Sequence, residues 1–346
     1  MNLSQKVTED IYFVGGSDRR LALFENAFPI ENGITYNSYL LLDDKNVLFD
    51  TVDNAIADVF FDNITSVLAG KSLDYIVINH MEPDHSATLE QVVLRYPEVK
   101  IICNDKAKKM VGQFFGEDMT DRFVEVKEGS TFSTGKHNLR FIMMPMVHWP
   151  EAMATYDETD KILFSADAFG SFGGFDGNIF DDEIKEEYFA EARRYYTNIV
   201  GKFGASVLAV LAKCEGLDIK LICPLHGVIW RKNIGKILEK YAIWAAFKPE
   251  EKAVVIVYAS IYGHTENACD LLAFNLVNKG VKNVKIYDVS KTDISVLVSE
   301  AFRASHLVVA SVTYNGGIFG KMEAFLQDLK AHNFQNRTVA VLENGT

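Results

Sequence analysis

Two stretches in the first part of this chain follow the same pattern. Tyr36–Asp50 and Met153–Asp167 each contain a strand, an acidic turn and a second strand that ends at an aspartate. After a helical stretch, each is followed by an apolar strand that runs into a histidine, His80 or His226. Two similar β-rich halves packed face to face, with helices outside, bring both strand ends to one edge. We therefore expect a functional site at that edge.

A change of pattern near residue 250 predicts a domain boundary. The length of 346 residues already suggests two domains at about 150 residues each. The region before the boundary contains strand-like segments at residues 21–24, 35–42, 46–49, 75–79, 99–103, 139–144, 152–156, 161–165 and 220–223. After the charged, proline-containing stretch Lys248–Lys252, strands and helices alternate regularly. We assign residues 1–249 to one domain and residues 250–346 to another.

The segment His80–His85 carries four potential metal ligands in six residues, between a buried strand and a helix expected to start near Ser86. In an extended segment, residues two apart point the same way, so His80, Glu82 and Asp84 can converge. Pro83 is expected to keep the segment out of helical geometry. Three further candidates stand at strand ends, namely His148, Asp167 and His226. Packing such side chains together without a metal would be costly, which predicts a metal site.

The other histidines and the cysteines have simpler interpretations. An isolated histidine is more often a core or surface residue than a ligand, and we interpret His137 and His332 in that way. The four cysteines form no C-x-x-C pair, so they are expected to be buried thiols in a reducing compartment. Their spacing also excludes a rubredoxin-type iron site within this sequence.

Charge and hydropathy limit the partners and the location. Lys and Arg total 35 against 47 Asp and Glu, and the net charge of −12 argues against a nucleic-acid partner. We find no apolar run close to the roughly 18 residues that span a bilayer. The first ten residues lack the apolar stretch of a secretory signal. A cytoplasmic protein without a membrane contact is expected.

The six candidate ligands resemble the metallo-β-lactamase superfamily, and specifically its flavodiiron branch, the A-type flavoproteins. The superfamily pattern is H-x-H-x-D-H, and Glu82 replaces its second histidine here. Further along, 63 residues separate Asp84 from His148, 18 separate His148 from Asp167, and 58 separate Asp167 from His226. These intervals are similar to those of the flavodiiron pattern.

The resemblance implies an α/β fold, with an N-terminal metallo-β-lactamase-like αββα sandwich that holds two non-haem iron ions. His80, Glu82 and His148 would hold one iron, Asp84 and His226 the other, and Asp167 would bridge them. His85 is a ligand in the superfamily but is generally turned aside in the flavodiiron branch, so we count it outside the ligand set.

The ligand chemistry agrees with iron. Three imidazoles and three carboxylates form a mixed nitrogen and oxygen site, which suits iron cycling between two oxidation states better than the nitrogen-richer sites of zinc hydrolases. The carboxylates and a bridging hydroxide would balance the charge of two ferrous ions. Open positions on such a pair can bind O2 or NO. Nearby aromatic residues that could line a pocket are Trp149, Phe169, Phe172, Tyr195 and Tyr196, although such residues are mostly core.

The second region begins with the apolar run Ala253–Ala259, which predicts a buried parallel strand. The loop after it, which opens the helix 268–278, consists of Ser260, Ile261, Tyr262, Gly263, His264 and Thr265. A hydroxyl-rich loop at a helix N-terminus can hold a phosphate, although such a turn is often only a cap. The lack of a P-loop lysine argues against a nucleoside triphosphate.

Two more loops follow predicted strands. The strand 306–311 leads to Thr313, Tyr314, Asn315, Gly316 and Gly317, and the strand 338–342 leads to a turn with Asn344 and Gly345. In open parallel sheets, ligands bind at the carboxyl ends of strands. These loops resemble those of flavodoxin, which implies a doubly wound parallel sheet with the FMN phosphate at the first loop and the flavin ring at the others.

The flavodoxin-like region contains four predicted strands, near residues 254–259, 284–288, 306–311 and 338–342. A flavodoxin-like unit has a fifth strand and further helices. We therefore expect either that the sequence is part of a chain about 50 residues longer or that its C-terminus was lost. FMN retention by the incomplete unit stays open.

The resemblance implies a flavodiiron oxidoreductase. Electrons would pass from a reduced donor, such as a separate rubredoxin, through FMN to the diiron site, which reduces NO to N2O or O2 to water. Family members pair as head-to-tail homodimers, in which the flavin of one subunit faces the irons of the other. Two alternatives stay open: a zinc-dependent hydrolase of the same superfamily with an appended flavodoxin module, and a flavin-only electron carrier.

Overall fold

The computed structural model of the chain describes residues 2–184 and 188–345. Its contacts divide the chain into two compact units. One comprises Met1–Ala192 and Ala209–Leu238, and the other comprises Arg193–Leu208 and Glu239–Thr346. Each unit has a hydrophobic core of its own. The expected boundary after residue 249 stays a proposal. Residues 193–208 and 239–249 precede this boundary, but they belong to the second unit together with the residues that follow it.

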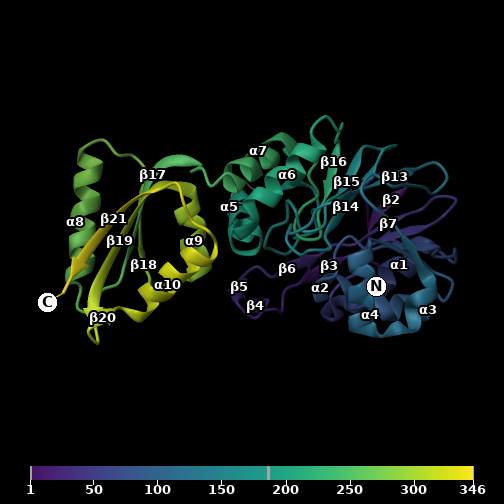
Figure 1. Cartoon of the computed structure of the whole chain (residues 1–346), viewed down its shortest axis with the longest axis horizontal. Helices are drawn as coiled ribbons and strands as arrows, with labels where there is room; N and C mark the ends of the chain where they lie inside the picture. Colours follow the sequence, from purple (N-terminus) through teal and green to yellow (C-terminus); the bar gives the residue numbers. More distant parts are fainter. Residues whose placement is uncertain (1, 185–187, 346) are drawn as a thin grey trace. The chain divides into compact units, whose positions relative to one another are not determined.

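The first unit is built around two sheets (Figure 1). The seven-stranded sheet has the order β1 (Gln5–Lys6), β2 (Ile11–Phe13), β7 (Tyr39–Leu41), β8 (Val47–Phe49), β9 (Tyr75–Val77), β10 (Lys100–Cys103) and β11 (Phe123–Glu125). The five-stranded sheet has the order β12 (Thr131–Ser133), β13 (Asn138–Met143), β14 (Met153–Asp157), β15 (Ile162–Phe164) and β16 (Leu221–Cys223). Two small hairpins join β3 (Gly16–Asp18) to β6 (Ile34–Tyr36) and β4 (Leu23–Phe24) to β5 (Phe28–Pro29).

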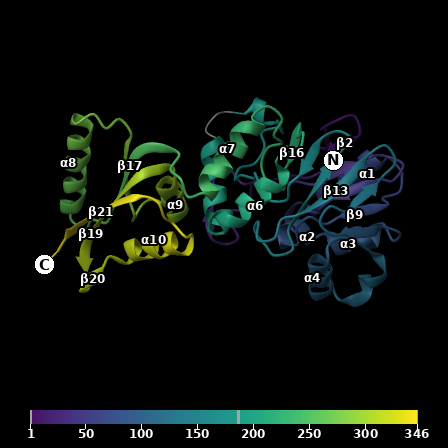
Figure 2. The same ribbon diagram turned by 45° about the horizontal axis from the view of Figure 1, so that its top comes forward.

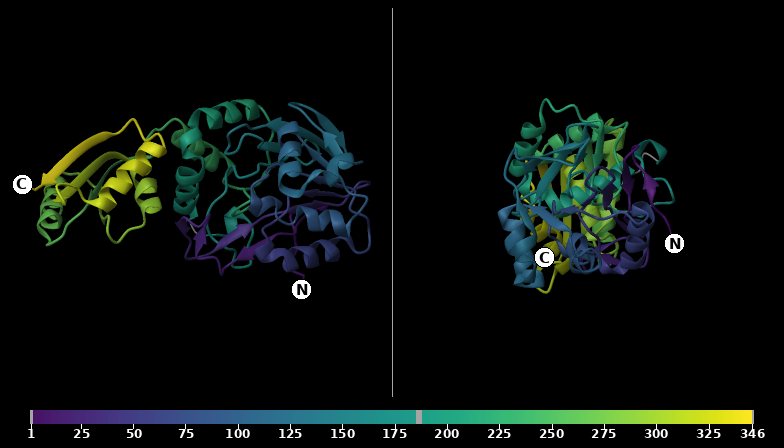
Figure 3. Two further views of the ribbon diagram at one scale, coloured as in Figure 1. Left: turned by 60° about the horizontal axis from the view of Figure 1, so that its bottom comes forward. Right: turned by 90° about the vertical axis from the view of Figure 1, so that its right-hand side faces the viewer.

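Helices flank these sheets. Helices α1 (Ala57–Leu68), α3 (Leu89–Arg95) and α4 (Asp105–Phe115) are the indigo and blue helices of the ribbon (Figure 3). The one-turn helix α2 (Pro83–Ser86) precedes α3, and α5 (Tyr188–Tyr195), α6 (Gly204–Cys214) and α7 (Ile234–Ala245) follow later in the chain. Local chemistry sets the ends: the Asn104 side chain caps α4 by accepting from the N–H groups of Lys106 and Ala107.

The repeated pattern in the sequence corresponds to a repeated arrangement of strands. Strand β7 pairs antiparallel with β8, which pairs parallel with β9, and β14, β15 and β16 repeat this arrangement in the second sheet. The two sheets share one core, in which the rings of Phe49 and Phe164 stack at 3.8 Å. The predicted αββα sandwich is therefore confirmed.

The second unit contains a parallel sheet in the order β18 (Val284–Asp288), β17 (Glu251–Tyr258), β19 (Ala304–Tyr314) and β21 (Thr338–Asn344). Strand β20 (Gly317–Ile318) folds back as a hairpin on β19. Helix α8 (His264–Asn278) lies on one face, and α9 (Ile294–Arg303) and α10 (Gly320–Ala331) lie on the other (Figures 1 and 2). This confirms the predicted flavodoxin-like doubly wound sheet.

One described helical run, Tyr188–Cys214, is long and apolar enough to cross a membrane by length and composition. The run is broken by a π-helical turn at Tyr196–Val200 and a 3-10 turn at Gly201–Phe203. It also contains Arg193, a buried residue whose guanidinium donates to Glu300 at 2.8 Å. These features are typical of a core helix, so the run is weak evidence for a membrane span.

His137 is buried, and both of its ring nitrogens have carboxylate partners. Nδ1 lies 2.8 Å from Asp157, and Nε2 lies 3.3 Å from Asp10. Burial alone would lower the pKa of His137, but the hydrogen bond to Asp157 and the weaker one to Asp10 outweigh it, and the pKa is raised. This agrees with a structural histidine.

We expect His137→Gln to destabilise the first unit by about 3 kcal/mol at pH 6, because it leaves the buried carboxylate of Asp157 without its cation. Since folding raises the pKa of His137, its contribution is complete below the unfolded pKa and is lost as the pH rises through the folded pKa. Urea unfolding at pH 6 and pH 9 checks this. An equal difference between the wild type and the variant at both pH values would contradict it.

Candidate metal centre

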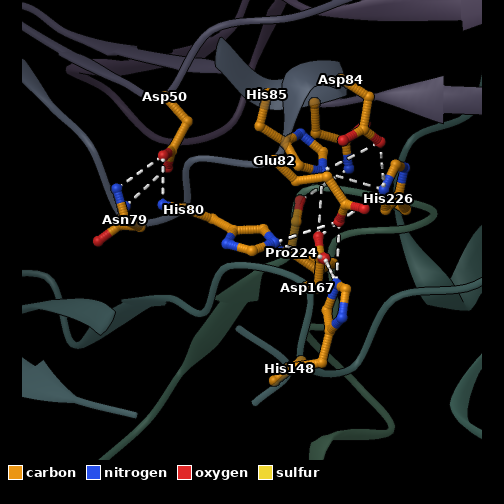
Figure 4. A network of polar contacts seen from close by, with 12 residues as sticks. Asp50, Asn79, His80, Glu82, Asp84, His85, His148, Asp167, Pro224 and His226 are labelled. Atoms are coloured by element: carbon orange, nitrogen blue, oxygen red, sulfur yellow. Dashed lines mark hydrogen bonds and ion pairs between the residues drawn. The ribbon is translucent and has the colours of Figure 1, made fainter. Parts of the chain in front are cut away.

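The backbone that leads to the centre is held by Asp50, which sequence reasoning had identified only as the end of a repeat. Its Oδ1 accepts from the N–H groups of Asn79 and His80 at 2.7 and 3.1 Å (Figure 4). Its Oδ2 accepts from the Asn79 side chain at 2.8 Å. Burial raises the pKa of Asp50 to about 6, while these hydrogen bonds oppose the rise. Asp50 thereby fixes the direction in which His80 leaves β9.

His80, Glu82, His148 and Asp167 form a first group of candidate metal ligands, called the first ligand group, in which one donor atom from each residue lies within 4.8 Å of the others. The side chains point toward one another (Figure 4). His148 Nε2 lies 2.9 Å from Glu82 and 3.0 Å from Asp167, and His80 Nε2 lies 3.3 Å from both carboxylates. The first two residues follow β9 of one sheet, whereas the other two follow β13 and β15 of the other sheet.

Asp84, His85 and His226 form the second ligand group. His226 Nε2 lies 3.2 Å from Asp84 Oδ2 and 3.0 Å from His85 Nε2. His85, which sequence reasoning placed outside the ligand set, thus points into the centre.

The expectation that Pro83 prevents helical geometry was wrong, because this residue begins the one-turn helix α2. Proline suits the first position of a helix, where its fixed φ is favourable and its missing N–H is not needed. The turn separates Asp84 from His80 and Glu82, and it places Asp84 in the second group instead.

Asp167 faces both groups. Its Oδ2 lies 3.0 Å from His148 Nε2, while its Oδ1 lies 3.1 Å from His85 Nε2. Among the described residues, Asp84 Oδ1 is buried with no hydrogen-bond partner, and Asp167 Oδ1 makes no hydrogen bond of good geometry although the His85 imidazole lies near it. Buried carboxylate oxygens without donors are costly, so they fit metal ions well.

The electrostatics of the groups also suit cations. Burial would lower the pKa of His148, but hydrogen bonds to Asp167 and Glu82 raise it to about 9. The pKa of Glu82 is held well below its usual range by His148 and His80, against the effect of burial. The carboxylates thus attract positive charge strongly, and metal ions can supply that charge.

Aromatic rings surround the two groups. The rings of Phe24 and Tyr36 lie 5.3 and 5.8 Å from His226, and Trp149 lies 5.5 Å from His80. Phe172 packs behind Phe24 at 5.6 Å. Of the aromatic residues expected to line the pocket, Trp149 thus lies beside a candidate ligand, whereas Phe172 packs on another aromatic ring. Tyr195 and Tyr196, in contrast, belong to the second unit, where Tyr196 packs on Tyr241 at 4.8 Å.

The three candidate flavin segments meet at one edge of the second unit's sheet. Gly263 caps α8 with a φ of 87°, and its N–H donates to Ser260 Oγ at 3.1 Å. Asn344 Nδ2 donates to Thr265 Oγ1 at 3.1 Å. A Cβ added to Gly345 would lie 1.9 Å from Thr313 Oγ1, so the third segment also passes close to the second. The third segment therefore contacts both of the others.

One local detail differs from the expectation. Thr313 and Tyr314 lie in β19 rather than in a loop, because the strand continues into the hairpin with β20. The turn contains Asn315 and Gly316, and Gly317 begins β20. The candidate residues of the second segment, from Tyr314 to Gly317, are exposed.

Comparison with known proteins identifies relatives of the whole chain. The family model for the ODP family beta lactamase matches residues 34–227. The anaerobic nitric oxide reductase flavorubredoxin of Aeromonas hydrophila is 33% identical over 97% of this chain and 68% of its own length. An uncharacterized protein of Methanocaldococcus jannaschii is 38% identical over 93% of this chain and 80% of its own length.

Solved structures of flavodiiron proteins also match the fold of this chain. The rubredoxin oxygen:oxidoreductase of Desulfovibrio gigas superimposes with a TM-score of 0.92 at 31% identity, over 99% of this chain and 86% of that one. The flavodiiron protein of Giardia intestinalis gives a TM-score of 0.93 at 25% identity, over 99% and 83% of the two chains. The chain belongs to the flavodiiron protein family. It is therefore an oxidoreductase of the flavodiiron type.

Sequence reasoning about this flavodiiron protein missed Glu151. This fully buried residue accepts through Oε1 from the Nδ1–H of His80 at 2.8 Å and from the N–H of Met81 at 2.9 Å. Burial would raise the pKa of Glu151, but these bonds hold it below its usual range. Glu151 lies in a loop next to Pro150, and nothing in its local sequence distinguishes it from an exposed charge.

Proposed function

We propose that this flavodiiron protein binds two iron ions, one at each ligand group. His80, Glu82 and His148 would hold the first ion, Asp84, His85 and His226 would hold the second, and Asp167 would lie between them. The observation that carries the proposal is the position of Asp167, whose two oxygens face the two groups. The mixture of imidazole and carboxylate donors suits iron.

We propose that the second unit binds FMN at the three segments that meet at the sheet edge. The N-terminus of α8, with Ser260 and Thr265, supports binding of the phosphate. The segments around Asn315 and Asn344 would contact the ring. The remaining candidate residues of these segments are Ile261, Tyr262, Gly263, His264, Thr313, Tyr314, Gly316, Gly317 and Gly345.

We propose that electrons from a rubredoxin-type donor reach the metal centre through FMN, and that the centre reduces NO to N2O or O2 to water. The names of the Aeromonas and Desulfovibrio relatives, a nitric oxide reductase and a rubredoxin oxygen:oxidoreductase, support these substrates and this donor. Iron bound there would supply the electrons and the open positions for the diatomic. Phe24, Tyr36 and Trp149 limit the access of water, and the ligands hold the two metal positions next to each other.

Metal analysis of protein produced with iron and zinc both available tests the metal assignment. We expect two iron ions per chain, because Glu82 replaces the additional histidine of zinc enzymes. Two zinc ions together with hydrolase activity would favour the alternative hydrolase, and a chain without metal would favour the flavin carrier.

We propose a head-to-tail homodimer in the cytoplasm, because FMN and the metal centre are assigned to different units and electrons must pass between them. The free cysteines of the described chain agree with a reducing compartment. Light scattering of the FMN-loaded protein should give the mass of two chains. A monomer with full activity would contradict the dimer.

A further inference from the structure

The two histidines that follow corresponding strands of the repeat, His80 and His226, have different partners on the side away from the centre. His80 Nδ1–H donates to the carboxylate of Glu151 at 2.8 Å. His226 Nδ1–H donates to the backbone carbonyl of Thr35 at 2.7 Å. One histidine thus has a charged acceptor, and the other has a neutral one.

Glu151 is held firmly in this position. Its carbonyl accepts from Asn104 Nδ2 at 2.6 Å, and the carbonyl of the preceding Pro150 accepts from Lys106 Nζ at 3.1 Å. Its Oε1 receives both donors, while its Oε2 is buried with no hydrogen-bond partner in the described chain. The full charge of the carboxylate therefore acts on His80 and on the backbone next to it.

Each ligand group has one carboxylate of its own, Glu82 or Asp84, and Asp167 faces both groups. Glu151 adds a buried negative charge behind the first group. A carboxylate that accepts from a ligand histidine fixes its tautomer and increases its basicity. A more basic imidazole stabilises the higher oxidation state of the metal that it binds.

We propose that Glu151 is a positioning residue that makes the two metal sites unequal. It holds His80 with Nε2 toward the centre, and it favours oxidation of the iron held by His80, Glu82 and His148 over oxidation of the iron held by Asp84 and His226. This inference rests on the proposed diiron function. When the reduced pair gives up one electron to a chemical mediator, Glu151 directs the loss to the His80 side.

Two substitutions separate orientation from charge. Glu151→Gln retains an oxygen that accepts from both His80 and Met81 but removes the charge, whereas Glu151→Leu removes both. The matched control is Asp157→Asn, because Asp157 is also buried and also lies 2.8 Å from the Nδ1 of a buried histidine, His137. A redox titration of the iron-loaded protein, followed by electron paramagnetic resonance, measures the first oxidation step.

For Glu151→Gln we expect two bound irons and a first midpoint potential at least 59 mV higher, which corresponds to a tenfold change in the one-electron equilibrium. For Glu151→Leu we expect iron affinity to fall about 10- to 100-fold in competition with a chelator. Asp157→Asn should change neither quantity. If Glu151→Gln retains iron and its first midpoint potential is unchanged, the inference is overturned but the proposed function stands. If the wild type binds no iron, the proposed function is overturned.

A second measurement applies even if Glu151→Gln does not fold. Nitrogen NMR of the histidines in metal-free wild type should show His80 protonated at Nδ1. A proton only on Nε2 of His80 would contradict the positioning role.

Discussion

Asp167→Asn is expected to lower the proposed reduction of NO or O2 at least about 100-fold while FMN remains bound. Loss of a residue that only orients a ligand typically costs 10- to 100-fold, and Asp167 faces both ligand groups directly. The asparagine also replaces a charged oxygen with a buried amide that cannot balance the metal charge. His148→Asn should have a comparable effect on the first group.

Gas consumption measured with an electrode, together with the flavin absorbance and the iron content of the same sample, checks this result. Asp181→Asn is a suitable control, because Asp181 is another buried aspartate and its carboxylate accepts from the backbone N–H groups of residues 231–233. The control should retain normal turnover. Full turnover in both Asp167→Asn and His148→Asn would falsify the diiron assignment.

Thr265→Val is expected to weaken FMN binding about 10- to 100-fold. Thr265 is buried in the first turn of α8, and a hydrogen bond from its hydroxyl to a charged phosphate is worth about 1.5–3 kcal/mol. Valine has the same shape, so the fold of the helix should persist. The substitution also removes the acceptor for Asn344, which links the first and third segments.

Fluorescence titration of the apoprotein with FMN gives the Kd. Thr292→Val makes the same replacement in the loop after β18, outside the three candidate segments, and should leave the Kd unchanged. Equal affinities for wild type and Thr265→Val would place the phosphate elsewhere.

The convergence of the candidate ligands could be predicted from the sequence because strand ends carry them. His80 and His226 follow apolar strands in a repeated pattern. That pattern corresponds to a parallel strand pair in each sheet, inside the seven-stranded sheet and at one edge of the five-stranded sheet. The spacing of the six candidate ligands along the sequence also indicated the flavodiiron family. None of this required knowledge of how the side chains are oriented.

Features that depend on long-range contacts could not be predicted in the same way. The predicted strand at residues 35–42 divides into β6 and β7 because Asn37 donates to the carbonyls of Pro224 and Gly227, far along the chain. Glu151 acts through its contacts with His80 and with the backbone of Met81. The short strands β1 and β12 lie at sheet edges and have little apolar pattern of their own.

Each ligand group draws on both sheets of the sandwich. His80 and Glu82 come from one sheet and His148 and Asp167 from the other, with the stacked rings of Phe49 and Phe164 between the sheets. The thickness of the hydrophobic core therefore determines the distance between candidate ligands that come from opposite sheets. A change of side-chain volume deep in this core, without any contact to a ligand, can alter which metal radius the centre accepts.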